Sequence, residues 1–252
     1  MAMWQFRLRR WIAVCIALAL AGGALPERVA GATAVPVKMT AYSARYQVSY
    51  RGLGGGQIEA SFKPGPVAGQ WLYETRAFPN LFGRLAVSPA AREHSTMNIG
   101  PSGVQPLAFE FNDGSADTAQ DVRHTFDWAV NRVTGVSKGK PFSVDVTPGT
   151  QNTASVQAAM MVERLNGRSP TSFRILTGNK LHDYRYWMEG TQQIMTPYGQ
   201  VEAEVWASQR TGSDRVSKVW HAPALGYVPV QAIQYRKGSP EVQMKLVSLQ
   251  RQ

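Results

Sequence analysis

Histidine and aspartate are the residue types here whose side chains could hold a metal ion or move a proton. The four histidines, His94, His124, His182 and His221, stand far apart in the 252-residue sequence. None pairs with another at the helical spacing typical of metal ligands. Isolated histidines are most often surface or packing residues. We therefore predict no metal site and no cofactor, and single out only His221, beside Trp220.

Three aspartates, Asp113, Asp117 and Asp121, recur every fourth residue after Asn112. They could share one helical face, or surround calcium in a loop. Their spacing differs from that of the standard twelve-residue calcium loop, and Asn112-Asp113-Gly114 is a common turn signal. A solvated loop is our interpretation, with calcium binding as the alternative.

Two segments resemble fragments of known signatures. Ser137-Lys138-Gly139-Lys140 has the Ser-x-x-Lys spacing of envelope acyl-enzymes, and 210–212 faintly echoes their third motif. Those enzymes hold the motif on a buried helix, which Gly139 and Pro141 would disrupt. The glycines at 52 and 54–56 suggest a phosphate loop, but a predicted strand follows where that mechanism needs a helix.

No catalytic residue is therefore assigned. The sequence has no Gly-x-Ser-x-Gly elbow. An envelope hydrolase is retained as an alternative, for which His221 or the aspartates would need a partner in space.

The first 32 residues have the three parts of an export signal. Basic residues at 7–10 precede an apolar run, 11–25, and a small-residue site follows at 30–32. The run is shorter than the roughly 20 residues needed to span a bilayer. Val14 precedes Cys15 where a lipoprotein signal needs a small residue. We predict cleavage after Ala32, a periplasmic location and no lipidation.

Cleavage also sets the composition of the mature chain. It removes four of the 27 basic and one of the 17 acidic residues, which leaves a net charge of +7. Cys15, the only cysteine, leaves as well, so the mature protein has no disulfide and no thiolate metal site. We expect a loose segment at 33–40 and a single β-rich domain at 41–252.

Alternating apolar and polar residues between turn signals predict many short strands. This pattern is typical of antiparallel sandwiches or barrels rather than parallel sheets. The predicted strands are 46–50, 58–63, 71–78 with an extension at 81–87, 93–99, 107–111, 123–128, 132–136, 142–146, 172–176, 182–188, 192–195, 201–208, 215–220, 228–235 and 241–249.

One segment has helical periodicity. Residues 153–166 begin with a possible Thr or Ser cap, contain good helix formers and end just before Gly167. We predict the main helix of the domain there.

Three stretches together resemble the domain-of-unknown-function 3108 (DUF3108) family of exported bacterial proteins. They are Tyr46-x-Val48-x-Tyr50-x-Gly52-Leu53-x-x-Gly56, the region 190–203 with its Thr196-Pro197-x-Gly199 turn, and Trp220-x-Ala222-Pro223 followed by Tyr227-Val228-Pro229-Val230. The resemblance implies an open β-barrel or strongly curved antiparallel sheet with one helix on its concave side, similar to LolA- and LolB-type lipoprotein carriers. It implies no catalytic residue. The chain departs from the family at 152–154 and in its Met-containing helix face.

The favoured function is non-catalytic binding of an apolar or amphipathic envelope ligand, such as a lipid or a lipoprotein acyl chain. Aromatic and Met residues could line the cavity or form its lid. The candidates are Val156, Met160, Met161, Leu165, Trp187, Trp206 and Trp220. An ordinary aromatic core, in an interaction module for envelope biogenesis that binds no ligand, is the alternative.

The scattered basic residues are interpreted first as an ordinary solvated surface, with peripheral contact with an anionic membrane surface as the alternative. An envelope protein is the other candidate partner. The basic residues are not clustered as in nucleic-acid binders, so we predict no nucleic-acid partner. The predicted strands carry charged residues on both alternation phases, as in 243–246, whereas an integral outer-membrane barrel needs a continuous apolar band facing the lipid. We therefore disfavour such a barrel.

Overall fold

The computed structural model describes residues 39–252. The predicted export signal and residues 33–38 of the predicted loose segment lie outside this range. Met39, from the end of that segment, is buried in the hydrophobic core.

Fifteen strands of the described region form one continuous sheet. Its order is β8-β7-β6-β5-β4-β3-β2-β1-β15-β14-β13-β12-β11-β10-β9, so the first and last strands pair in the middle. Neighbours are antiparallel except β9 and β10. The bounds are β1 Tyr42–Tyr50, β2 Leu53–Pro64, β3 Gln70–Pro79, β4 Arg92–Gly100, β5 Gly103–Asn112, β6 Val122–Asp127, β7 Arg132–Ser137, β8 Lys140–Asp145, β9 Gln151–Asn152, β10 Ser172–Thr177, β11 Lys180–Thr196, β12 Gly199–Arg210, β13 Arg215–Ala222, β14 Val228–Arg236 and β15 Ser239–Arg251.

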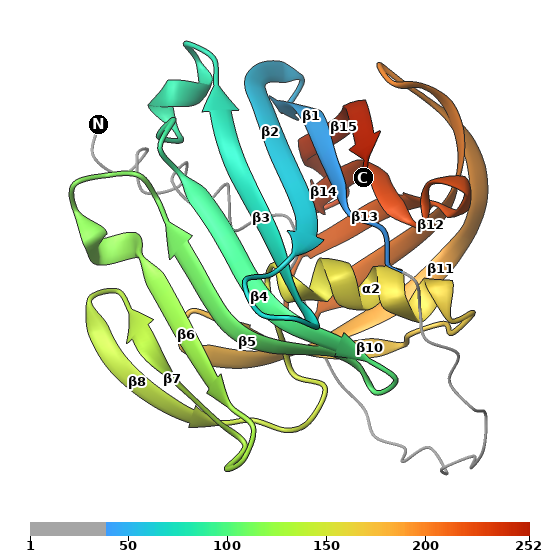
Figure 1. Cartoon of the computed structure of the whole chain (residues 1–252). Helices are drawn as coiled ribbons and strands as arrows, with labels where there is room; N and C mark the ends of the chain where they lie inside the picture. The colour runs from blue at the N-terminus through green and yellow to red at the C-terminus, as the bar shows by residue number, and fades with distance from the viewer. Residues whose placement is uncertain (1–38) are drawn as a thin grey trace.

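The sheet curls strongly, as Figure 1 shows. Its two ends approach each other through side chains rather than through strand pairing. The His124 Nε2 on β6 lies 2.6 Å from Gly178 O in the β10–β11 turn, and Gln151 on β9 donates to Val104 O on β5. Phe126, Val133, Val146 and Leu176 form a hydrophobic cluster where these strands meet. The sheet is therefore open along its edges but nearly encloses its concave side.

The one α-helix among residues 39–252, α2 (Ser155–Leu165), occupies that concave side (Figure 1). Every residue from Ser155 to Val162 is buried. The cap is neither Thr nor Ser: Asn152 Oδ1 accepts hydrogen bonds from the backbone N–H groups of Ala154 and Ser155. Ser155 Oγ accepts in return from the Asn152 N–H, a reciprocal arrangement that resembles a capping box.

The alternation along the strands supplies the core around α2. On β1 the buried side chains are Tyr42, Ala44 and Tyr46, at every second position. Tyr42 Oη lies 3.8 Å from Met161 Sδ, and Tyr46 Oη donates to Pro229 O at 2.9 Å. The first strand thus contacts both the helix and the opposite wall.

The fold class predicted from the sequence and the family resemblance is confirmed: a mainly β, strongly curved open sheet with one α-helix on its concave side. The strand extension at 81–87 is wrong, because this segment forms a loop with the 3₁₀-helix η2 (Gly83–Leu85). The strands predicted at 182–188 and 192–195 are one long strand, β11, with a bulge between Met188 and Gly190. The two-residue strand β9 was not predicted, since it is too short to show periodicity.

Candidate ligand groove

An apolar groove runs along the concave face beside the start of α2. One wall comes from β2 and β3, the other from β13 and β14, and the floor from β1 and β15. Its volume is about 60 Å³, room for a few water molecules because about 10–15 Å³ holds one. The residues that line it are Tyr46, Ile58, Ala60, Tyr73, Thr75, Arg76, Ala77, Glu93, Thr153, Gln157, Val219, Pro229, Ala232 and Met244.

The groove continues away from the helix into a second cavity of about 50 Å³. The two cavities share Ile58, Ala77 and Met244 as lining residues. The second is also lined by Gly55, Gly83 and Val87, from the start of β2 and the η2 loop. The two adjoining cavities together therefore extend from the N-terminus of α2 to the end of the sheet that carries the η2 loop.

A buried carboxyl group closes the inner end of the groove. Glu93 on β4 is 6% exposed, and Thr153 Oγ1 donates a hydrogen bond to its Oε1 at 3.1 Å. Burial raises the pKa of Glu93 to about 7, although the Thr153 hydrogen bond acts in the opposite direction. Near neutral pH this carboxyl can therefore be a hydrogen-bond donor as well as an acceptor.

The same strand holds the start of the helix. Asn152 Nδ2 donates to Ser95 Oγ at 2.8 Å, and Ser95 Oγ donates to Ala108 O on β5. Glu93, Ser95 and Met97 are the buried alternate positions of β4. Two successive inward-facing polar residues on one strand thus anchor the polar turn that precedes α2.

The other end of the helix is fixed by an ion pair between Arg164 and Glu204, which we call the Arg164 clamp. Arg164 forms two hydrogen bonds with Glu204 on β12, at 2.9 and 3.0 Å, and both side chains are only 11% exposed. Trp206 Nε1 also donates to Glu204, and the guanidinium lies over the rings of Trp206 and Tyr227. Burial alone would raise the Glu204 pKa, but the bonds from Arg164 and Trp206 outweigh it and hold the pKa below its usual range.

His221 lies close to this clamp but is poorly placed for catalysis. It is 2% exposed, its Nδ1 lies 2.9 Å from Tyr227 O, and it pairs with Glu204 across β12 and β13. Burial lowers the His221 pKa to about 4, against the opposing influence of the Tyr227 bond. His124 is equally buried, and burial lowers its pKa to about 4 as well. Both rings are therefore neutral packing groups near pH 7.

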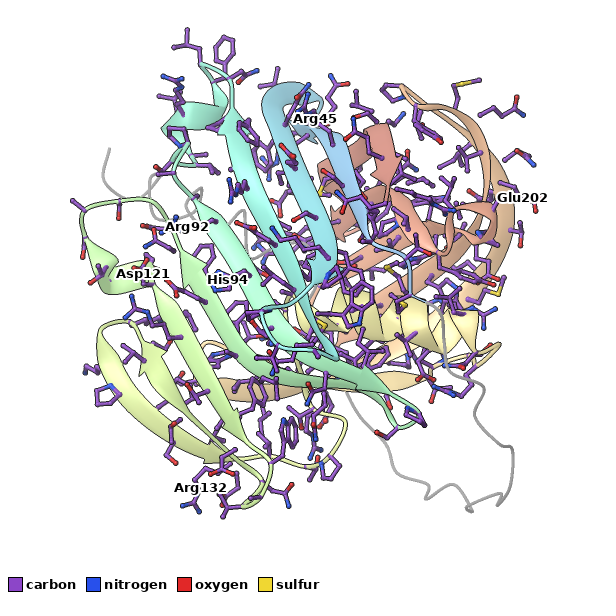
Figure 2. All side chains as sticks on the ribbon, viewed as in Figure 1. Arg45, Arg92, His94, Asp121, Arg132 and Glu202 are labelled. Carbon is purple, nitrogen blue, oxygen red and sulfur yellow. The ribbon has the colours of Figure 1, made fainter. Side chains whose placement is uncertain are left out.

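The aspartates form a loop of internal hydrogen bonds. Asp121 accepts from Asn112 and from the Asp113 N–H, and Asp113 accepts from Ser115. Asp117 caps the 3₁₀-helix η3 (Thr118–Gln120). Figure 2 shows Asp121 at the side of the sheet remote from α2. Within residues 39–252, no group of three or more His, Cys, Asp or Glu side chains could hold a metal ion.

The candidate residues on α2 divide between two sides of the helix. Val156 and Met160 pack with Trp206, Tyr184 and Tyr186 in one hydrophobic cluster. Met161 belongs to the main core. Met161 and the more exposed Leu165 line a separate cavity of about 60 Å³ near Met39 and Leu225.

The three candidate tryptophans do not converge on one site. Trp206 contacts the Arg164 clamp and the Val156 cluster. Trp220 belongs to the main core and donates to Gln192 Oε1 at 2.9 Å. Trp187 is half-buried under the guanidinium of Arg185. The groove itself is instead lined by Tyr, Ala and Met side chains that were not proposed from the sequence.

Glu93 was also missed, although the sequence carries a signal for it. In Glu93-His94-Ser95-Thr96-Met97 the charged residue shares an alternation phase with Met97, and a carboxylate on the inward phase of a strand is rarely buried without a reason.

A curved open sheet that wraps around one buried helix, with an apolar groove on the concave face, defines this structural class. The chain belongs to the DUF3108 family, described as proteins of unknown function, whose model matches residues 45–247. A β-barrel-like protein of the DUF1849 family from Brucella abortus shares the fold, with 13% identity, a TM-score of 0.54 and coverage of 85% of this chain and 98% of that one. The structure of MucB in complex with MucA(peri) is similar at 10% identity and a TM-score of 0.36, over 84% of this chain and 50% of that one.

A search of the curated proteins found no match. Among the described residues, no helix has the length and apolar character that a bilayer crossing requires.

Proposed function

We propose that this is an exported, non-catalytic protein that binds the apolar part of an amphipathic envelope ligand, a lipid or a lipoprotein acyl chain, in the concave groove. The observation that carries the proposal is the continuity of the apolar lining from Glu93 to the η2 loop. An acyl chain inserted along this path contacts Ile58, Ala77 and Met244. Each methylene removed from water contributes about 0.8 kcal/mol.

The volume of the groove limits how the ligand is held. Typical small-molecule pockets measure roughly 300–1,000 Å³, whereas the enclosed part here is about 60 Å³. A long chain must therefore widen the groove or leave part of its length at the open end. The sheet is open along its edges, so its walls can separate without the loss of strand pairing.

The experiment compares purified protein with two variants that fill the groove. Ala77→Phe and Ala232→Phe add a ring on opposite walls, and Ala129→Phe, in the exposed turn after β6, is the matched control. Myristate and a myristoyl lysophosphatidylglycerol are the probes. We expect both ligands to raise the melting temperature of the parent and of Ala129→Phe, and to leave the two groove variants unchanged.

Circular dichroism establishes that the variants fold, and Ala232→Phe is the less demanding of the two because Ala232 is only half-buried. Solvent extraction and mass spectrometry of the parent provide an independent readout. A parent protein that carries no lipid and shows no thermal shift with either probe refutes the proposal.

That result would instead favour an interaction module with a filled interior. The burial of α2 from Ser155 to Val162 and the small cavities beside it support this second candidate. Its partner would then be an envelope protein, bound on the outer surface.

A further inference from the structure

The four most exposed large hydrophobic side chains of the described region gather at one end of the sheet. Leu53, Leu81, Phe82 and Leu85 are 71–80% exposed, and we call them the apolar tip. Leu53 follows the β1–β2 turn, and the other three belong to the loop between β3 and β4. Four isolated surface hydrophobics would need no explanation, but four in one place mark an interaction site.

Hydrogen bonds, rather than burial in a hydrophobic core, hold the loop of the tip in place. The 3₁₀-helix η2 has no buried residue. Asn80 fixes the loop to β2, because its side chain donates to Gly54 O and its N–H donates to Gly55 O. Asn80 Oδ1 also accepts from the Gly83 N–H. A Cβ on Gly83 would overlap Gly55 O, so only glycine permits this close approach.

Figure 2 shows the side chains of this loop standing clear of the ribbon at the top of the view. The sequence thus presents Leu81, Phe82 and Leu85 on a loop that hydrogen bonds keep ordered. An ordered apolar surface loses little conformational entropy when it is covered.

Positive charge surrounds the tip. Arg84 lies between Phe82 and Leu85, is exposed, and forms no ion pair with another described residue. Arg51, in the β1–β2 turn, is largely exposed, although it pairs with Glu241. Lys237 is exposed in the neighbouring β14–β15 turn. Apolar side chains flanked by basic residues fit the boundary between anionic head groups and acyl chains.

The acidic side chains at this end of the sheet are paired with arginines: Glu241 with Arg51 and Arg215, and Asp214 with Arg236. The loop that holds Asp113, Asp117 and Asp121 contacts the β3–β4 loop beyond the tip, where Ser88 Oγ donates to Gly114 O. The net charge, +10 for the whole sequence and +7 without the predicted export signal, has the same sign as the tip. Charge complementarity therefore favours an anionic lipid surface over a second copy of this positively charged chain.

We propose that the apolar tip docks this protein on anionic lipid bilayers, with Leu81, Phe82 and Leu85 inserted among the acyl chains and Arg84 and Arg51 on the head groups. The mouth of the groove is lined by Gly83 and Val87 of the same loop. Docking therefore brings the open end of the groove to the bilayer. The docking surface is separate from the groove and does not depend on whether the groove takes a ligand.

The test is flotation of the protein with vesicles of phosphatidylethanolamine and phosphatidylglycerol, compared with vesicles of phosphatidylcholine. The tip variant is Leu81→Ser/Phe82→Ser. Val130→Ser/Met195→Ser is the matched control, since Val130 and Met195 are 62% and 66% exposed but lie outside the tip. We expect the parent and the control to bind the anionic vesicles, and the tip variant to bind them about tenfold less or weaker still.

Arg84→Gln tests the contribution of positive charge to vesicle binding while the apolar side chains of the tip stay unchanged. It should weaken binding to anionic vesicles by about fivefold and make binding less sensitive to salt. Equal binding of the parent and the tip variant overturns the proposal, as does a parent that binds neither kind of vesicle. A parent dimer that becomes monomeric in the tip variant, with no vesicle binding, would show that the tip is an interface between copies.

Failure of docking can be told apart from failure of the groove proposal. Ala77→Phe should retain vesicle binding while it loses the thermal response to myristate. The tip variant should lose vesicle binding while it retains that response.

Discussion

Replacement of Glu93 by Gln should change how the stability of this protein depends on pH. In the unfolded chain the carboxyl has a pKa of 4.5, and in the folded protein burial raises the pKa to about 7. Between these values the folded state holds a proton that the unfolded state has released. Stability therefore falls as pH rises through this window, and the loss attributable to Glu93 amounts to about 3 kcal/mol.

The buried histidines act with the opposite sign. His124 and His221 have unfolded pKa values of 6.5 and folded values of about 4. Between these values the unfolded state binds the extra protons, so stability rises with pH at about 1.4 kcal/mol per pH unit for each ring. From pH 4.5 to 6.5 the two histidine contributions oppose the one from Glu93, and these three groups together raise stability by about 3 kcal/mol.

Glu93→Gln removes only the opposing contribution. Its amide oxygen can still accept from Thr153, which lies 3.1 Å from Glu93 Oε1. Between pH 4.5 and 6.5 the variant should therefore gain about 3 kcal/mol of stability relative to the parent, because it lacks the opposing contribution of Glu93. The free energy of unfolding of the variant should increase steadily relative to that of the parent up to about pH 7. Above pH 7 the difference between the two proteins should stay constant.

Urea unfolding, followed by tryptophan fluorescence at a series of pH values, measures this difference. Glu202→Gln, which alters an exposed carboxylate on β12, is the control for loss of a charge. Because the histidines are common to all three proteins, their contributions cancel in the comparison. A difference between Glu93→Gln and the parent that is independent of pH would refute the reasoning about the buried carboxyl.

Three further substitutions test what holds the helix and the tip, each by urea unfolding. Arg164→Met leaves Glu204 buried without its partner and should cost about 3–5 kcal/mol; a loss below 1 kcal/mol would contradict a buried clamp. Asn152→Ala removes the cap of α2 and should cost about 1–2 kcal/mol; Asn152→Asp should recover most of it. Gly83→Ala forces the η2 loop away from Gly55 and should cost about 1–3 kcal/mol, while unchanged stability would show that this approach is not rigid.

The strands and the helix were predictable because each carries a local signal. Alternation predicted β1 from residue 46 to 50, and the structure extends the strand back to Tyr42, with Tyr42, Ala44 and Tyr46 buried at every second position. Gly167 marks the end of α2. The segment 81–87 misled the same reasoning. Its apolar residues, including Leu81 and Leu85, look like a strand by composition, but they are exposed rather than buried. Composition alone does not tell whether such residues are buried or exposed to solvent.

The groove and the Arg164 clamp could not be predicted from the sequence, because they bring together residues that are remote in it. Arg164 and Glu204 are forty positions apart, and Thr153 and Glu93 are sixty apart. Such pairs depend on the curvature of the sheet, which arises from small twists accumulated over many strands. The tryptophans were chosen for size and apolar character, yet the curvature places smaller residues such as Ala60 and Ala77 at the groove.

In the proposed binding mode, the two anchors of α2 would set how deep an acyl chain can go. Thr153 and Asn152 bind β4 at one end of the helix, and Arg164 binds Glu204 at the other. Separation of the Arg164 pair costs about 3–5 kcal/mol, while each extra methylene buried returns about 0.8 kcal/mol. A chain bound as we propose would have to bury about four to six methylenes beyond the resting groove before displacement of the helix became favourable. Shorter chains would then end at Glu93, and the helix would act as a stop for short ligands and as a displaceable plug only for long ones.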